Sequence, residues 1–130
     1  MREILFRGKV VDNGEWVEGC FVSGNKVESY ILKEYYDWEE AITVTPETIS
    51  QYTGLKDKNG VKIFEGDILT VKLNESLADC GKVYIADSGA WMWHDYLVKH
   101  VKHEAMVVTN IHDNPELLKE KICLSALSAT

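Results

Sequence analysis

Two acidic side chains flank a glycine in the stretch IFEGDIL, where Glu65 and Asp67 lie two positions apart. Side chains at i and i+2 of a strand point the same way, so this pair has the spacing of an acid–base couple. Such a couple needs an apolar pocket that raises one pKa, and a glycine at this position usually marks a bend that separates its neighbours. We therefore expect a corner of the chain, in which Gly66 permits the backbone conformation and Asp67 bonds the turn. No catalytic residue is predicted.

The histidines are the residues from which a metal site would be built: His94, His100, His103 and His112. His100 and His103 would share one face of a helix, and Asp95 or Glu104 would add an oxygen ligand. Two histidines among lysines are more typical of a solvated face. Zinc sites with recognisable spacing use four ligands, and this chain has no closely spaced cysteine pair. We expect no metal and no cofactor.

Aromatic side chains form two groups that could stack on a ligand or anchor a partner: Tyr35, Tyr36 and Trp38, and then Trp91, Trp93 and Tyr96. Single-strand binders alternate such aromatics with cations, whereas Trp38 is followed by two glutamates. Two interpretations stay open. The rings fill a small β core, or Trp91, Trp93, Tyr96 and Trp38 form a patch that binds a partner protein.

Motifs of nucleotide binding and of nucleophilic catalysis are missing from the sequence. The glycines form neither GxGxxG nor GxxxxGK[ST], and no serine lies in a nucleophile elbow. We predict that the protein is not an enzyme.

Short strands separated by turn residues must position these side chains. Residues 4–32 form three β-type runs with turns at Asn13-Gly14 and Ser23-Gly24, which predicts a meander. Residues 61–64, 68–73, 81–86 and 104–111 supply further strands; Leu69, Val71 and Leu73 share one face of the second. The class of the segment 88–103 stays open. The fold predicted is mainly β, a small barrel or half-barrel of short antiparallel strands with a few short helical segments.

Two helical segments are expected. Thr45 is a helix cap with Pro46 at the first position, in a segment that runs through Ile49. Asn114-Pro115 begins a second helix. A single domain is predicted over residues 1–130, with a meander at about 1–44, a barrel-like part at about 45–118 and a helical tail at about 115–130.

Charge and cysteine content restrict the partners and the compartment. The 130 residues carry 21 acids and 14 bases, a net charge of −7, and the bases form no stripe, so DNA binding is not expected. Three cysteines far apart predict reduced thiols. The N-terminal MREILFRGK has no apolar core of a signal peptide, and no apolar run is long enough to span a bilayer. A cytoplasmic protein is expected.

Three blocks of the sequence resemble one family: RGK with NGEWVEG (7–9 and 13–19), TPETISQYTGLKDKNGVKIFEGDIL (45–69) and NIHDNPELL (110–118). In order and spacing they resemble the YopX-like proteins of phages and prophages of Gram-positive bacteria. The resemblance implies a mainly β fold and an origin in a mobile element. It implies no activity and no catalytic residues. The segment 88–103 departs from the family pattern, and the tail beyond Leu118 is longer.

Two functions follow as hypotheses: a non-enzymatic phage or prophage accessory module that acts by protein contact, with a host or phage protein as partner, and a nucleic-acid-associated role. A homo-oligomer is also expected, first through an apolar C-terminal stripe that includes Leu117, Leu124 and Leu127, and as an alternative through the aromatic region around Trp91. The stripe could instead dock on its own chain, or the tail could fray.

Overall fold

The structure is a computed structural model, and it describes residues 4–23, 29–32, 41–72, 74, 77–114 and 122–124. The chain divides into two compact units, residues 1–52 and residues 53–130. The first unit thus extends beyond residue 44, where the sequence predicted the end of the meander. Each unit has its own apolar core and is described separately below.

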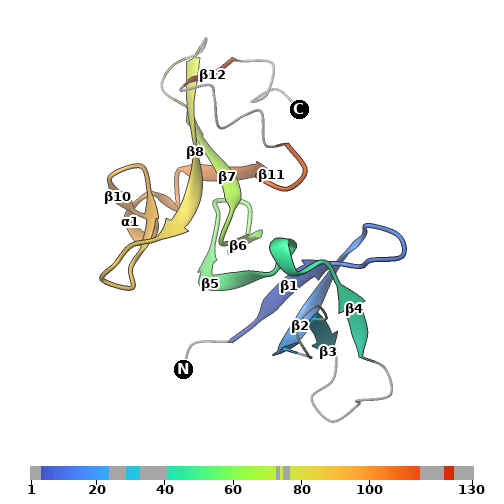
Figure 1. Cartoon of the computed structure of the whole chain (residues 1–130). Helices are drawn as coiled ribbons and strands as arrows, with labels where there is room; N and C mark the ends of the chain where they lie inside the picture. Colours follow the sequence, from blue (N-terminus) through green and yellow to red (C-terminus); the bar gives the residue numbers. More distant parts are fainter. Residues whose placement is uncertain are drawn as a thin grey trace. The chain divides into compact units, whose positions relative to one another are not determined.

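The first unit is an antiparallel sheet with strand order β4-β3-β2-β1-β5. Its strands are β1 (Phe6–Lys9), β2 (Trp16–Ser23), β3 (Ser29–Leu32), β4 (Ile42–Val44) and the beginning of β5 (Ser50–Lys56). Consecutive strands β1, β2 and β3 pair with one another, which confirms the predicted meander (Figure 1). Phe6 pairs with Gly19 and Lys9 with Trp16, so Asn13-Gly14 lies in the connection as expected.

The core of the first unit lies on one face of this sheet. Val17, Ile31 and Val44 are buried there. A Cβ atom on Gly8 would lie 3.0 Å from the Cβ of Val44, so β4 approaches β1 closely only because residue 8 has no side chain. Val44 also forms a bridge with Val10, which curls the sheet. Each of these buried aliphatic side chains stabilises the fold by roughly 1.5–3 kcal/mol.

The helical turn predicted at Pro46 is present, but its predicted cap is wrong. It is a single 3-10 turn, η2 (Pro46–Thr48), and Thr45 makes no side-chain cap. The Thr48 side chain stabilises the turn instead. Its hydroxyl donates to the Thr45 carbonyl at 2.6 Å and accepts the Lys9 N–H at 2.9 Å. The bond to Lys9 therefore attaches the turn to β1.

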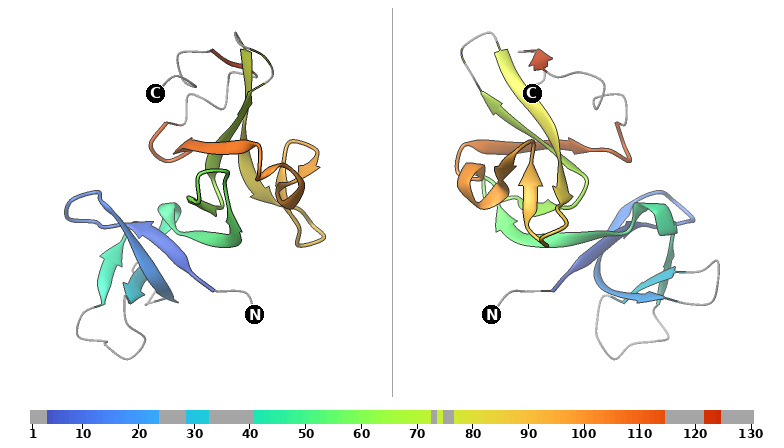
Figure 2. Two further views of the ribbon diagram at one scale, coloured as in Figure 1. Left: turned by 180° about the vertical axis from the view of Figure 1, so that it is seen from behind. Right: turned by 60° about the vertical axis from the view of Figure 1, so that its left-hand side comes forward.

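The second unit contains a sheet of strand order β10-β9-β8-β7-β11, with β12 also paired to β8. Its elements after β5 are β6 (Lys62–Phe64), β7 (Asp67–Lys72), β8 (Leu77–Ile85), β9 (Trp91–Trp93), β10 (Tyr96–Leu97), α1 (Val98–Val101), β11 (Ala105–Asn110) and β12 (Ile122–Leu124). The long strands β7 and β8 run side by side in all views (Figures 1 and 2). The first residues of β5 pair with β1, and β5 then pairs with β6.

Strand β7 is buried on both faces, because Ile68 and Leu69 point in opposite directions into different clusters. Leu69 packs with Ile63, Val83, Trp91, Trp93, Val98 and Ala105, with Val71 at the margin. The predicted shared face of Leu69 and Val71 is confirmed; Leu73 lies outside the described residues.

A mainly β fold of short antiparallel strands with short helical segments is confirmed, although the strands that the structure describes form two sheets and do not close into a barrel. The segment 88–103 is a hairpin, β9–β10, followed by the single turn α1. In the tail, residues 122–124 form a strand on β8 where a helix was predicted, since the edge of β8 offers backbone partners there. The predicted helix start at Pro115 lies outside the described residues. Among those described, no helix has the length and apolarity to cross a bilayer.

Candidate functional site

The acid–glycine–acid step is a corner, as predicted. Gly66 has φ +84°, its N–H donates to the Val83 carbonyl at 2.9 Å, and its carbonyl accepts the Ile111 N–H at 2.9 Å. Asp67 is 1% exposed, and its Oδ2 accepts the Phe64 N–H at 2.7 Å. The Asp67 carboxylate therefore holds the turn between β6 and β7 and is shielded from solvent.

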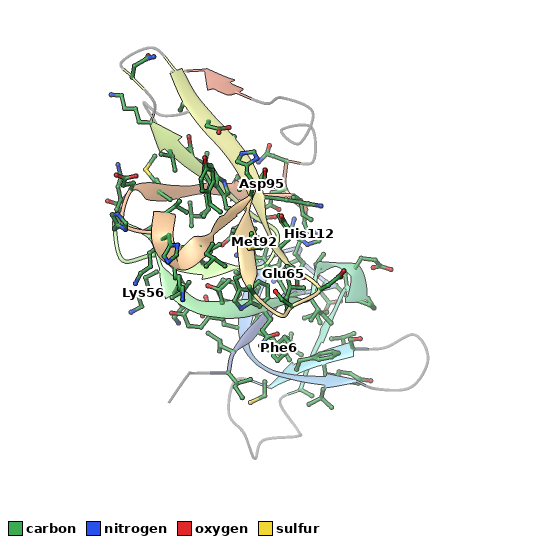
Figure 3. All side chains as sticks on the ribbon, turned by 90° about the vertical axis from the view of Figure 1, so that its left-hand side faces the viewer. Phe6, Lys56, Glu65, Met92, Asp95 and His112 are labelled. Atoms are coloured by element: carbon green, nitrogen blue, oxygen red, sulfur yellow. The ribbon has the colours of Figure 1, made fainter. Side chains whose placement is uncertain are left out.

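The last residue of β11 and the turn that follows it complete this corner. Asn110 pairs with Asp67 across the two strands, and its Oδ1 accepts the N–H groups of His112 and Asp113 at 3.0 Å each. Its Nδ2 donates to Oδ2 of Asp113 at 2.9 Å. Figure 3 shows Glu65 and His112 at this corner. The amide and acid side chains of this turn thus bond the backbone and each other.

The candidate metal ligands do not converge in the residues that the structure describes. His100 belongs to α1, which ends at Val101, so His103 lies beyond the helix and the shared helical face that a metal site would need is not formed. Both side chains are exposed, whereas His112 is partly buried at the corner. Across the described ranges, no three His, Cys, Asp or Glu side chains are grouped so as to hold a metal.

His94 has a structural environment of its own in the β9–β10 turn. Its φ of +52° is unusual for a residue with a side chain. Its Nε2 lies 2.9 Å from the Cys80 carbonyl oxygen and 3.2 Å from Oδ1 of Asp79. Both partners are acceptors, so Nε2 carries a proton. A Cβ atom on Gly81 would lie 2.6 Å from Nε2, so the ring occupies space that only glycine leaves free.

The aromatic group of the second unit is divided between core and surface. Trp91 is 8% exposed and Trp93 is 3% exposed, and both belong to the core. The Trp93 indole N–H reaches the carbonyls of Leu69 and Gly81 at 3.2 and 3.1 Å. Tyr96 is 59% exposed. Core filling thus accounts for both tryptophans. The partner patch stays a prediction, and among its members that the structure describes Tyr96 has the accessible ring.

The first aromatic group, Tyr35, Tyr36 and Trp38, lies outside the described residues. One cysteine expectation is corrected: Cys20 is free, but Cys80 is disulfide-bonded. The cytoplasmic location, which rested partly on reduced thiols, stays a prediction.

The strongest candidate binding site was not predicted from the sequence, and it lies on the β1–β2 hairpin. Arg7 pairs with Glu18 and Lys9 with Trp16, so all four side chains project from the face opposite Val17. The Arg7 guanidinium carbon lies 4.5 Å from the centre of the Trp16 ring, and the Lys9 Nζ lies 5.5 Å from it. Both distances fall within the roughly 6 Å range of cation–π attraction. We call these four residues the Trp16 surface.

An open groove of about 540 Å³ adjoins the Trp16 surface. It is lined by Val10, Asn13, Glu15, Trp16, Val17, Glu18 and Ile42. Its apolar side chains are Val10, just after β1, Trp16 and Val17 of β2, and Ile42 of β4. Its two carboxylates are Glu15, just before β2, and Glu18 of β2. The alternation of RGK and EWVE contained the signal for this site, because residues two apart share a strand face. An aromatic side chain flanked by cations, beside a groove of apolar and polar side chains, has the means to bind a ligand without any catalytic group.

These observations define a small protein of two β-rich units, the first of which carries the Trp16 surface. The family model described as YopX protein matches residues 5–119, and the chain belongs to the YopX family. Among solved structures it is similar to protein EF1440 from Enterococcus faecalis, with 28% sequence identity and a TM-score of 0.58; the match covers 91% of this chain and 99% of the other. No curated protein matches the chain.

Proposed function

We propose that this YopX-family protein is a non-enzymatic interaction module of a phage or prophage, and that it binds a host or phage protein in the cytoplasm through the Trp16 surface. The observation that carries the proposal is the partly buried Trp16 ring beside two cations and an open groove. Tryptophan and arginine are the residues most enriched at the centres of protein interfaces.

The packing of Trp16 supports a role in binding. Val17, the next residue, supplies the core of the unit, so the fold already has its apolar contact from this strand. Trp16 lies on the other face, where Arg7 and Lys9 hold its ring in place before a partner arrives. A preorganised aromatic side chain loses little conformational entropy on binding.

A nucleic-acid role is the second candidate, because an aromatic ring beside two cations is also how single strands are bound. Against it, Glu15 and Glu18 line the adjoining groove, and the net charge of the chain is −7. We expect no more than weak, non-specific DNA binding at physiological salt. A mobility shift with single- and double-stranded probes over a salt series tests this, and sub-micromolar binding at that salt would favour the second candidate.

The principal experiment is capture of partners from a lysate of the host cell with wild-type protein, Trp16→Ala and Tyr96→Ala. Tyr96→Ala is the matched control, because it removes an exposed aromatic ring from the second unit. We expect a specific partner that Trp16→Ala loses by roughly tenfold or more, the size of an interface hot spot, and that Tyr96→Ala retains.

The reverse result, in which Tyr96→Ala loses the partner and Trp16→Ala keeps it, would move the binding site to the β9–β10 hairpin. If neither the wild type nor Tyr96→Ala retains any protein above background, the interaction module is wrong.

A further inference from the structure

We propose that four lysines of the second unit form a binding surface for an acidic segment of a partner protein. They come from the end of β5 with its connection to β6, and from α1 with the residue that caps its C-terminus. We call them the lysine surface: Lys56, Lys58, Lys99 and Lys102. The proposed function places its contact on the first unit, so the lysine surface is a second and separate place of contact.

The two segments that supply the lysines are held next to each other by the fold. The N–H of Lys58 donates to the carbonyl of Ala105, the first residue of the strand after α1, at 3.1 Å. Oδ2 of Asp57 accepts the N–H of Val107 on the same strand at 2.9 Å. Figure 3 is seen from the side of α1, and it shows Lys56 on that side of the unit. The lysines of both segments therefore belong to one part of the surface.

The short helix α1 turns its apolar side chains inward. Val98 is fully buried and Val101 packs on the same apolar cluster, as expected for residues three apart on a helix. Lys99 lies between them and is exposed, and Lys102 is partly buried. A lysine can bury its aliphatic stem while its ammonium group stays in water. The valines thus fix the helix, and the lysines remain available to a partner.

Neighbouring carboxylates leave the positive charge of the lysine surface largely uncompensated. None of the four lysines forms an ion pair in the part of the chain that the structure describes. Asp57 lies between Lys56 and Lys58, but its carboxylate is buried and accepts three backbone N–H groups. Glu104 is the exposed carboxylate of residues 56–58 and 98–104. Like charges held close together repel one another, and a partner with several carboxylates relieves that repulsion.

The charge of the rest of the chain favours a short acidic segment over a nucleic acid. The net charge is −7, so without the four lysines it would be −11. Exposed charges act over about 10 Å at moderate salt, so a short acidic segment interacts mainly with the lysines. A long phosphate chain would extend over the acidic remainder. The second unit also contains no arginine, the residue that binds phosphate at two points.

The test is an amide NMR titration of the whole protein with a capped octapeptide in which four glutamates alternate with serines. A matched peptide has glutamines in place of the glutamates. We expect the glutamate peptide to shift the amides of residues 56–60 and 98–104 with an affinity of about 1 mM or better, since each exposed ion pair contributes little. The glutamine peptide should bind at least about fivefold more weakly. An increase in salt from about 50 to about 300 mM should weaken the glutamate peptide by a similar factor.

Charge reversal provides the matched variants. Lys58→Glu/Lys99→Glu is expected to weaken binding of the glutamate peptide at least about fivefold. Lys72→Glu/Lys82→Glu makes the same change in net charge and should stay within about twofold of wild type. Both control lysines are exposed and lie on the face of the sheet that carries Ile68, away from the cluster on which α1 packs. The dispersion of the amide spectrum shows whether each variant is folded, and Lys58→Gln/Lys99→Gln replaces a double variant that is not.

Four results would overturn the inference: no shift of these amides at millimolar glutamate peptide, equal binding of the glutamine peptide, an equal effect of Lys72→Glu/Lys82→Glu, or tighter binding of a single-stranded pentanucleotide, which has four phosphates, to the same residues. The first three would make the lysines an ordinary solvated face, and the fourth would make them a nucleic-acid site. The outcome does not depend on partner capture through Trp16, because the titration uses no lysate and the lysine variants leave the first unit unchanged.

Discussion

Asp57 shows how one carboxylate can organise a turn of the chain and also attach it to a distant strand. Its side chain is 6% exposed. Oδ1 accepts the N–H groups of Asn59 and Val61 at 2.8 and 2.9 Å, and Oδ2 accepts the Val107 N–H on β11 at 2.9 Å. A buried carboxylate with three backbone donors is stable only while all of them are in place.

Asp57→Ala is therefore expected to lower the free energy of unfolding by about 2–4 kcal/mol, because three N–H groups lose a charged acceptor. Asp57→Asn, which keeps one acceptor oxygen, should cost less. Urea denaturation measures both. Asp87→Ala, in an exposed turn, is the control and should stay within about 0.5 kcal/mol of wild type. Equal effects at the two aspartates would show that the Asp57 bonds contribute little.

The position of the His94 side chain depends on Gly81, because the imidazole occupies the space that a Cβ atom at residue 81 would fill. Gly81→Ala should cost about 1–3 kcal/mol in the wild-type background, because His94 must leave the Cys80 carbonyl. In a His94→Ala background the same change should be neutral or slightly stabilising, as alanine restricts the unfolded chain. A double-mutant cycle by urea denaturation checks this, and additive effects would contradict it.

At the scale of elements, the corner at Gly66 joins three strands through its backbone. The corner connects β6 to β7, bonds β8 through Val83 and bonds the residue after β11 through Ile111. The family-like blocks 45–69 and 110–118 meet here. Their resemblance to the family thus coincides with a structural junction of the second unit.

We predict that Gly66→Ala costs more than Gly89→Ala. Both glycines have positive φ, which costs a residue with a side chain roughly 1–2 kcal/mol. Gly66 is also buried, and its backbone bonds Val83 and Ile111, so a shift that relieves the strained φ disturbs both bonds; Gly89 is exposed. Thermal or urea denaturation of the two variants should differ by about 1 kcal/mol. Equal costs would mean that the two backbone bonds of Gly66 add no penalty.

At the scale of the whole molecule, the described surface keeps several large apolar side chains in water. The most exposed are Ile4 at 72%, Tyr96 at 59% and Val11 at 56%. Single exposed apolar residues are common in monomers, so these alone do not define an interface. They do show that both units expose apolar side chains that an interface with another copy could bury.

We expect a homo-oligomer, with the C-terminal segment as the first place to look. The predicted helical stripe no longer supports this expectation, because residues 122–124 form a strand on β8. Leu117 and Leu127 lie outside the described residues. Light scattering over a dilution series gives the mass. A monomer at tens of micromolar would contradict the prediction. If the protein is oligomeric, truncation after Leu118 should weaken the assembly, and an unchanged mass would place the interface elsewhere.

Local pattern was enough to predict the β class, the N-terminal meander and the corner at Gly66. Turn residues and the alternation of strands act over a few positions, so short stretches such as Asn13-Gly14 and residues 65–67 contain the information needed. The same reasoning put Leu69 and Val71 on one face. It predicted the helical turn at Pro46 but not the bond between Thr48 and Lys9 of β1, because that contact is not local.

Burial and long-range pairing were decided only by the tertiary structure. Trp91, Trp93 and Trp16 look alike in the sequence, yet two lie in a core and the third lies on the opposite face of its strand from the core residue Val17. In the sequence Asp57 is an ordinary turn residue. Only the structure shows that it accepts the N–H of Val107 on β11, fifty positions along the chain. Each of these outcomes depends on which strands lie next to one another, and strand order is set by the sum of many weak contacts that no single stretch of sequence contains.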